Sequence, residues 1–151
     1  MAQAQQVPAV ARCHGVEVPP SPFLNETRIA RINAGRYEGQ EIAGALAVIR
    51  PGDRVLEMGS GLGLVGAIAA RNAKPQAVLS FEANPALIPH IRDLYARNGL
   101  EDRIAVHNRV VISAPDRPET LPFHVRNSFL GSSLIDSDAR ATTRVDVPTV
   151  A

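Results

Sequence analysis

The spacing of apolar residues is helical over the stretch 26–49. Isoleucine and leucine recur there every three or four positions, and glycines interrupt the pattern at positions 35 and 39. This spacing predicts two amphipathic helices with a break at Gly35–Gly39, because each helix then gathers its apolar side chains on one face. The turn residues Pro51-Gly52-Asp53 predict the end of the second helix.

Short apolar runs then alternate with helical stretches. Val55–Met58 is followed by a glycine turn and a helix of small residues, and Ala77–Phe81 is followed by a helix with one apolar face. Asn84 stands where it could cap that helix, and Gly99 where it could end it. A third run covers Ile104–Val106. Because strands that alternate with helices form parallel sheets, the sequence predicts an α/β fold with a Rossmann-like, doubly wound, mostly parallel sheet.

The pattern changes after Ser113. Leu121–Val125 and Arg144–Val150 are predicted strands, and Ser128–Leu134 is a predicted loop between them. This part of the chain is therefore expected to form a hairpin-like excursion beside the three strands of the parallel sheet.

The first residues differ from the rest in composition. Residues 1–22 are small, polar and rich in proline, and they predict a flexible N-terminal arm in which Gly15–Val18 adds a short strand. The chain is long enough for one domain at most, and residues 23–151 are assigned to it. The start of the chain lacks the basic residues and the apolar core of a signal peptide, so a cytoplasmic location is the default expectation.

Charge and composition narrow the classes of partner. Basic and acidic residues nearly balance, with a net charge of +1, and no cluster of Lys and Arg suggests a nucleic-acid partner. Apolar stretches fall far short of the ~20 residues that a membrane span needs, so no membrane partner is expected. Cys13 and His14 have no second Cys or His pair to complete a metal site, and no metal is expected. The oligomeric state stays open.

The glycine turn, residues Gly59 to Gly63, is the first candidate for chemistry. Gly59, Gly61 and Gly63, with Ser60 between them, let the backbone bend sharply after a strand and approach a ligand closely. Glu82, followed by Ala83, ends the second strand, where a carboxylate can accept hydrogen bonds from both ribose hydroxyls of a nucleoside. Strand, glycine turn, helix and distant acid together indicate a nucleotide-binding crevice.

Two cofactor classes use such a crevice. The stretch from Gly61 to Gly66 fits the dinucleotide pattern G-x-G-x-x-G, and Glu82 stands at the right distance for the ribose of NAD. Glu57, two residues before Gly59, argues against NAD because a carboxylate at the strand tip repels a pyrophosphate. The same carboxylate suits the ammonium and sulfonium charges of S-adenosylmethionine. A NAD-dependent dehydrogenase-type domain stays an alternative, as does a non-catalytic nucleotide-binding domain.

The order acid-x-Gly-x-Gly-x-Gly resembles motif I of the class I S-adenosylmethionine-dependent methyltransferases. Several further stretches resemble, in their order along the chain, the FkbM-type members of that class. They are Arg36-Tyr37-Glu38, Pro51-Gly52-Asp53, Val55–Gly63, Phe81-Glu82-Ala83-Asn84-Pro85, Arg97-Asn98-Gly99-Leu100 and Ser132-Ser133-Leu134.

This resemblance implies methyl transfer from S-adenosylmethionine to a hydroxyl oxygen of a small-molecule acceptor, such as a sugar or a polyketide. It implies that Glu57 and the glycine turn hold the methionine part, Glu82 the ribose, and Asn108 the adenine. Ala83, next to Glu82, is also expected to contact the cofactor. Tyr37 and Glu38 are expected to close over the cofactor.

Sequences of the FkbM type continue beyond the point that matches Val147–Ala151, with an acidic stretch and a further core strand. We therefore expect the chain to hold the N-terminal, cofactor-binding portion of a truncated methyltransferase domain, inactive by itself. No catalytic residue is predicted.

Overall fold

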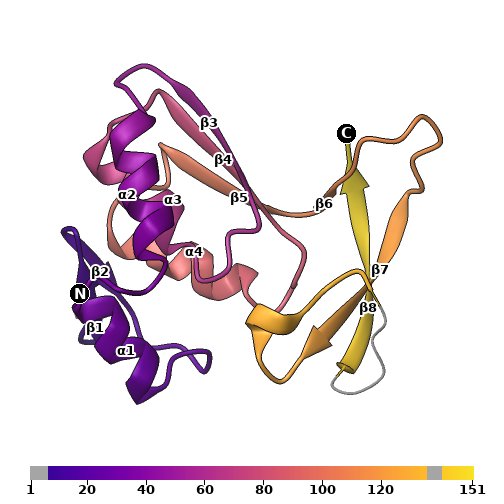
Figure 1. Ribbon diagram of the computed structural model, residues 1–151, viewed down its shortest axis with the longest axis horizontal. Helices are drawn as coiled ribbons and strands as arrows, with labels where there is room; N and C mark the ends of the chain where they lie inside the picture. Colours follow the sequence, from indigo (N-terminus) through magenta and orange to yellow (C-terminus); the bar gives the residue numbers. More distant parts are fainter. Residues whose placement is uncertain (1–6, 136–140) are drawn as a thin grey trace, which may run out of the picture.

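The computed structural model describes residues 7–135 and 141–151. A three-stranded sheet stands between a group of helices on one side and a second three-stranded sheet on the other (Figure 1). The helices are α1 (Glu26–Asn33), α2 (Gly39–Val48), α3 (Leu64–Asn72), α4 (Ile88–Arg97) and the 3₁₀ helix η1 (Phe129–Gly131). The strands are β1 (Ala11–Cys13), β2 (Val16–Val18), β3 (Arg54–Met58), β4 (Ala77–Glu82), β5 (Ile104–Asn108), β6 (Val110–Val111), β7 (Thr120–Arg126) and β8 (Ala141–Val150).

The central sheet is parallel and has the order β3-β4-β5. Leu56 pairs with Leu79, and Leu79 pairs with Ala105, so the three strands end at the same edge of the sheet. Helix α3 connects β3 to β4, and α4 connects β4 to β5. The predicted α/β fold with a parallel sheet and crossover helices is confirmed.

The two faces of this sheet have different surroundings. Val78 and Ile104 point toward the helices and are buried in the core with residues of α3 and α4. Leu56, Met58 and Leu79 point the other way and are 56%, 67% and 40% exposed. Among the described residues, helices therefore cover only one face of the sheet, which differs from the two covered faces of a complete doubly wound fold.

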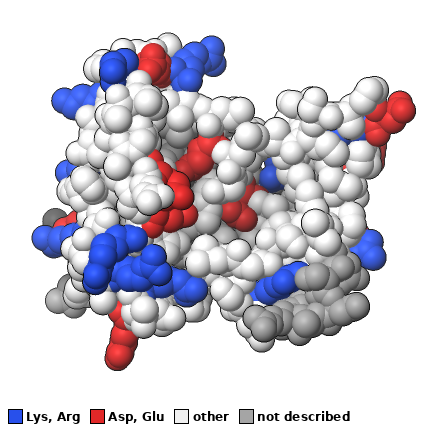
Figure 2. Space-filling view, in the orientation of Figure 1, with Lys and Arg blue, Asp and Glu red and all other residues white. Residues whose placement is uncertain are grey.

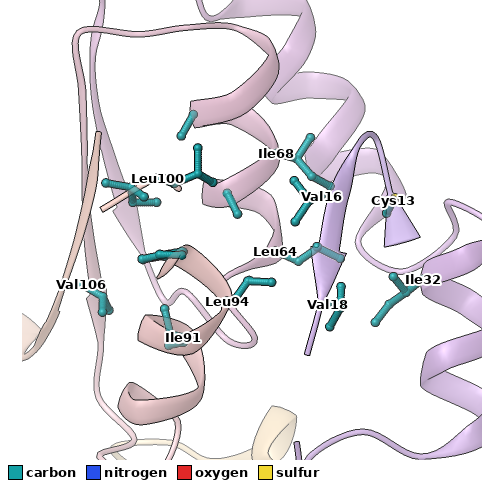
Figure 3. Packing of buried hydrophobic residues seen from close by; sticks show 14 of the residues in the cluster. Cys13, Val16, Val18, Ile32, Leu64, Ile68, Ile91, Leu94, Leu100 and Val106 are labelled. Atoms are coloured by element: carbon teal, nitrogen blue, oxygen red, sulfur yellow. The ribbon is translucent and has the colours of Figure 1, made fainter. Parts of the chain in front are cut away.

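The N-terminal hairpin belongs to the core, where the sequence predicted a flexible arm. β1 and β2 pair antiparallel, and Val16 is fully buried against the helices (Figure 3). Two polar side chains fasten the hairpin to α4. The Arg97 guanidinium forms an ion pair with Glu17, and the Asn98 side chain hydrogen-bonds both the N–H and the C=O of Glu17. The alternating apolar side chains of this short hairpin pack on the helices. The prediction of a flexible arm followed the proline-rich composition and gave this alternation too little weight.

The predicted glycines lie where helices end, but the predicted helix cap at Asn84 differs from the structure. The break between α1 and α2 includes Gly35 in the left-handed region, at φ 66°, and Gly99, at φ 62°, follows α4. Asn84 does not cap α4 directly. Its side chain accepts from the N–H of Ala86 and forms a turn that delays the helix to Ile88. No helix among the described residues has the length and apolarity to cross a membrane.

The second sheet has the order β6-β8-β7. β7 and β8 pair antiparallel, as the two strands predicted after Ser113 suggest, and η1 lies in the predicted loop. β6 pairs parallel with the end of β8 and was not predicted, because a two-residue strand exists only through its distant partner. Residues 136–140, between the loop and β8, lie outside the described part of the chain.

Candidate functional site

A cavity of about 340 Å³ opens at the carboxyl ends of β3 and β4. Open parallel sheets bind ligands at this edge, and the volume lies within the roughly 300–1,000 Å³ typical of small-molecule sites. The space-filling view shows acidic side chains gathered in the hollow between the helix-covered sheet and the β6–β8–β7 sheet (Figure 2). The lining residues are Glu38, Met58, Gly59, Gly61, Phe81, Glu82, Ala83, Leu87, Arg109, Val110, Val111, Phe123, Phe129, Leu130, Ser132 and Leu134.

The glycine turn forms the floor of this cavity and is braced against β4. The backbone N–H groups of Gly59 and Ser60 both donate to the carbonyl oxygen of Phe81, at 2.8 and 3.1 Å. Gly63 donates to the Ser60 carbonyl at 2.7 Å, and Gly61 donates to the Glu82 carboxylate at 2.9 Å. Four N–H groups of the turn are thus bound within the protein, which leaves few of them for a phosphate.

The glycines of the turn have different tasks. Gly59, at φ 83°, faces open space, so its lack of a side chain leaves room in the cavity. Gly63 lies behind the cavity, where a Cβ atom would stand 2.9 Å from Cγ2 of Ile91 on α4. Only Gly61 and Gly59 of the predicted glycines line the cavity, and Gly63 serves the packing of α3 against α4.

Glu82 lies at the end of β4, buried from the outside but lining the cavity. One carboxylate oxygen accepts from Gly61 and the other accepts from the N–H of Asn84, at 2.9 and 2.8 Å. Burial raises the pKa of this carboxyl, and the N–H groups of Asn84, Gly61 and Ala83 act against that rise. The carboxylate is therefore held in one position relative to the turn.

Asn108 holds the backbone that follows Glu82. Its side-chain amide donates to the carbonyl oxygens of Glu82 and Ala83, at 2.9 and 3.0 Å. Ala83 lines the cavity, and so does Arg109, the residue that follows Asn108. Asn108 itself does not belong to the lining residues. Its expected contact with an adenine ring stays a prediction.

Glu57 does not line the cavity, which differs from its expected place at the tip of β3. Side chains alternate along a strand, and Glu57 stands between the outward-facing Leu56 and Met58, so it points toward the helices. Its carboxylate accepts from the Ser80 hydroxyl and lies against Gly66 in the first turn of α3. Burial raises its pKa, while Ser80, the Gly66 N–H and Ser60 favour the charged form. Glu57 therefore places a negative charge at the positive N-terminus of α3.

The Tyr37–Glu38 pair divides between the core and the cavity. Tyr37 is 5% exposed and packs in the hydrophobic core, with no hydrogen-bond partner for its hydroxyl among the described residues. Glu38 lines the cavity across from Gly61. Burial, then the charges of Glu41 and Glu57, raise the pKa of Glu38 to about 7. In the sequence, Glu38 was a candidate only through the family resemblance, together with Tyr37. The spacing of residues along the chain did not indicate a ligand contact for it.

Most of the other residues that line the cavity were not predicted from the sequence. Arg109 and Val110 follow directly after Asn108, and Phe123, Phe129 and Ser132 come from the β7 and η1 region. A side chain can be assigned to such a wall only when the position of the second sheet is known. The stretch Ser132-Ser133-Leu134, which the resemblance singled out, was the one available signal, and two of its residues line the cavity.

Comparison with known proteins gave solved structures alone. No family model and no curated protein matches the chain. The Trypanosoma brucei PRMT1 enzyme–prozyme complex with AdoHcy is 23% identical over 44% of this chain and 22% of that chain, with a TM-score of 0.39. A Geobacter sulfurreducens SAM-dependent methyltransferase in complex with S-adenosyl-L-homocysteine is 23% identical over 45% and 28%, with a TM-score of 0.40. A dimethyladenosine transferase from Plasmodium falciparum is 19% identical over 52% and 27%, with a TM-score of 0.42.

The matched region spans less than a third of the length of each of these three proteins. The similarity is confined to the fold, and the role of each residue rests on the geometry of the cavity.

Proposed function

We propose that the cavity binds S-adenosylmethionine and that the chain carries the cofactor-binding part of a methyltransferase. The observation that carries the proposal is the position of Glu82, whose carboxylate lines the cavity at the end of β4 beside the glycine turn. Each carboxylate oxygen has two lone pairs, and Gly61 and Asn84 use one on each oxygen. The Ala83 N–H also favours the charged form of Glu82. We propose that the lone pairs left free by these N–H groups accept from the ribose hydroxyls.

Charge supports S-adenosylmethionine over a dinucleotide. A pyrophosphate needs free N–H groups at the start of a helix. Here the carboxylate of Glu57 already lies at the start of α3, and the glycine turn uses four N–H groups internally. The carboxylates of Glu38 and Glu82 face the cavity. A cationic ligand suits these surroundings better than a doubly charged anion.

The walls fit the requirements of methyl transfer. The cofactor, when bound, supplies a methyl group on a positively charged sulfur. The protein then has to orient the ligand and exclude water, which needs shape rather than a nucleophile. Phe123, Phe129 and Leu130 line the same cavity and give its wall an apolar surface that suits this task.

The finer assignment concerns the methyl acceptor. Transfer to a hydroxyl oxygen of a small molecule or sugar rests on the sequence resemblance to FkbM-type methyltransferases. Ser132 and Leu134, from a stretch of that resemblance, line the cavity and support this choice.

Titration calorimetry tests the proposal. S-adenosylhomocysteine should bind the chain, and NAD should give no measurable heat of binding at the same concentrations. The exchange of Glu101→Gln, at an exposed position outside the cavity, serves as the control and should change neither result. Tighter binding of NAD than of S-adenosylhomocysteine would overturn the assignment.

A further inference from the structure

Glu38 and Glu82 both line the cavity, but their carboxylates are satisfied to different degrees. Both oxygens of Glu82 accept backbone N–H groups. Oε2 of Glu38 is buried and has no hydrogen-bond partner among the described residues. A buried oxygen without a donor is costly for the folded protein, and such a group in a cavity wall is a candidate for a ligand contact.

The backbone of Glu38 is also unusual. It lies in the left-handed region at φ 49°, just before the first residue of α2. This conformation is unfavourable for a residue with a Cβ atom, and such strain is concentrated at functional sites. It brings Oε1 to 3.9 Å from the place where a Cβ on Gly61 would stand. The strain thus directs a carboxylate at the glycine turn.

We propose that Glu38 receives the ammonium group at the amino-acid end of the cofactor, the position that sequence reasoning gave to Glu57. This inference rests on the proposed function. The ammonium is the chemistry that an unpaired carboxylate recognises best, because the pair combines opposite charge with a hydrogen bond. Glu57 cannot take this part, since its carboxylate lies under the first turn of α3 and away from the cavity.

The charges that shift the pKa of Glu38 are acidic, while Arg31 and Arg36 line a separate cavity that Glu38 also borders. Glu41 on its own helix and Glu57 on β3 both disfavour the ionised form of Glu38, and Glu82 lines the same cavity. Arg109 is the basic residue of the cavity lining among the described residues, and its guanidinium donates to the Asn108 carbonyl. An ammonium group placed at Glu38 would relieve the repulsion between these carboxylates.

The test compares two ligands on three proteins. S-adenosylhomocysteine carries the ammonium, whereas 5′-methylthioadenosine has the same nucleoside without the amino-acid end. Calorimetry with both ligands is run on the wild type, on Glu38→Gln and on the matched control Glu41→Gln, whose side chain is exposed on the same helix. Glu38→Gln should weaken S-adenosylhomocysteine about 10- to 100-fold and leave 5′-methylthioadenosine unchanged. Glu41→Gln should leave both affinities within about twofold of the wild type.

A pH series adds a second readout. The affinity of the wild type for S-adenosylhomocysteine should rise between pH 6 and pH 7.5, roughly, as Glu38 loses its proton while the ligand's amino group, with an ordinary pKa near 8, keeps its own. The rise should be absent in Glu38→Gln, although Glu57 and Glu82 are still present.

Each outcome decides between the two proposals. Equal loss of both ligands in Glu38→Gln, or no loss of either, would overturn the role of Glu38 and leave the proposed function standing. Absence of binding of both ligands to the wild type would overturn the proposed function, and the role of Glu38 with it.

Discussion

The carboxylates around the glycine turn differ at the scale of the single residue. Glu57 stabilises the start of α3, backbone N–H groups fix Glu82, and Oε2 of Glu38 has no donor in the described part of the chain. All three have raised pKa values, with burial as the main cause. The same residue type therefore serves the fold in one position and faces the ligand cavity in the others.

Replacement of Glu82 tests the ribose contact. Glu82→Ala removes a charged acceptor and should cost about 1.5–3 kcal/mol of binding free energy for S-adenosylhomocysteine, or about 10- to 150-fold in affinity. Because Glu82 also accepts from Gly61 and Asn84, the melting temperature of the variant has to be measured beside its affinity. Unchanged affinity in a folded variant would mean that the ribose binds elsewhere.

Replacement of Glu38 by glycine tests the backbone strain. Glycine adopts φ 49° without penalty, so Glu38→Gly should raise the free energy of unfolding by about 1 kcal/mol. The pKa of about 7 in the folded state lies above the ordinary value of 4.5, so the folded state binds this proton more tightly. The contribution of Glu38 to stability is therefore complete below pH 4.5 and is lost as the pH rises through 7. The gain in Glu38→Gly should be larger at pH 8 than at pH 5.

Urea unfolding at both pH values measures this effect. Glu41→Gly is the control, because glycine inside the first turn of α2 should lower the stability by about 1 kcal/mol. If Glu38→Gly were less stable than the wild type at pH 8, the claim that the backbone of Glu38 is strained would be wrong.

At the scale of the elements, the strand–turn–helix unit was predictable because its signals are local. The apolar run of β3, the glycines of the turn and the small residues of α3 stand side by side in the sequence. The direction of Glu57 was not predictable from the glycine motif alone, because it depends on which face of β3 the helices cover. The packing of the β1–β2 hairpin and the strand β6 were not predicted for a similar reason, because both depend on contacts with residues distant in the sequence.

The close contact of α3 with β3 gives a prediction for Gly66. A Cβ atom there would stand 2.6 Å from the Glu57 carboxylate and 2.8 Å from Cδ1 of Ile104. Gly66→Ala should therefore destabilise the fold by about 1–3 kcal/mol. In α2, a Cβ on Gly44 would meet no described atom within 4 Å, so the matched change Gly44→Ala should stabilise by about 0.5–1 kcal/mol. Thermal unfolding of both variants checks the pair, and a stabilising Gly66→Ala would contradict the packing.

At the scale of the whole molecule, the face of the sheet opposite the helices carries exposed apolar side chains. Leu56, Met58 and Leu79 lie on it, and within the described residues no strand pairs with the outer edge of β3. Exposed apolar patches and unpaired strand edges both promote association between chains.

The chain of 151 residues should therefore self-associate as its concentration rises. The double change Leu56→Thr and Leu79→Thr keeps strand propensity but removes apolar surface, and it should shift the chain toward the monomer. Val48→Thr, at an exposed apolar position on α2, is the control and should have no such effect. Sedimentation velocity separates these cases, and a wild-type chain that stays monomeric at high concentration would contradict the prediction.

The most direct test of the central claim is an experimental structure of the chain with S-adenosylhomocysteine. The ligand should lie in the cavity beside Gly59 and Gly61, with its ribose hydroxyls roughly 2.5–3.0 Å from the Glu82 carboxylate oxygens. Its ammonium group should contact Glu38. A ligand bound outside this cavity, or a ribose that leaves Glu82 with its contacts to Gly61 and Asn84 alone, would contradict the account.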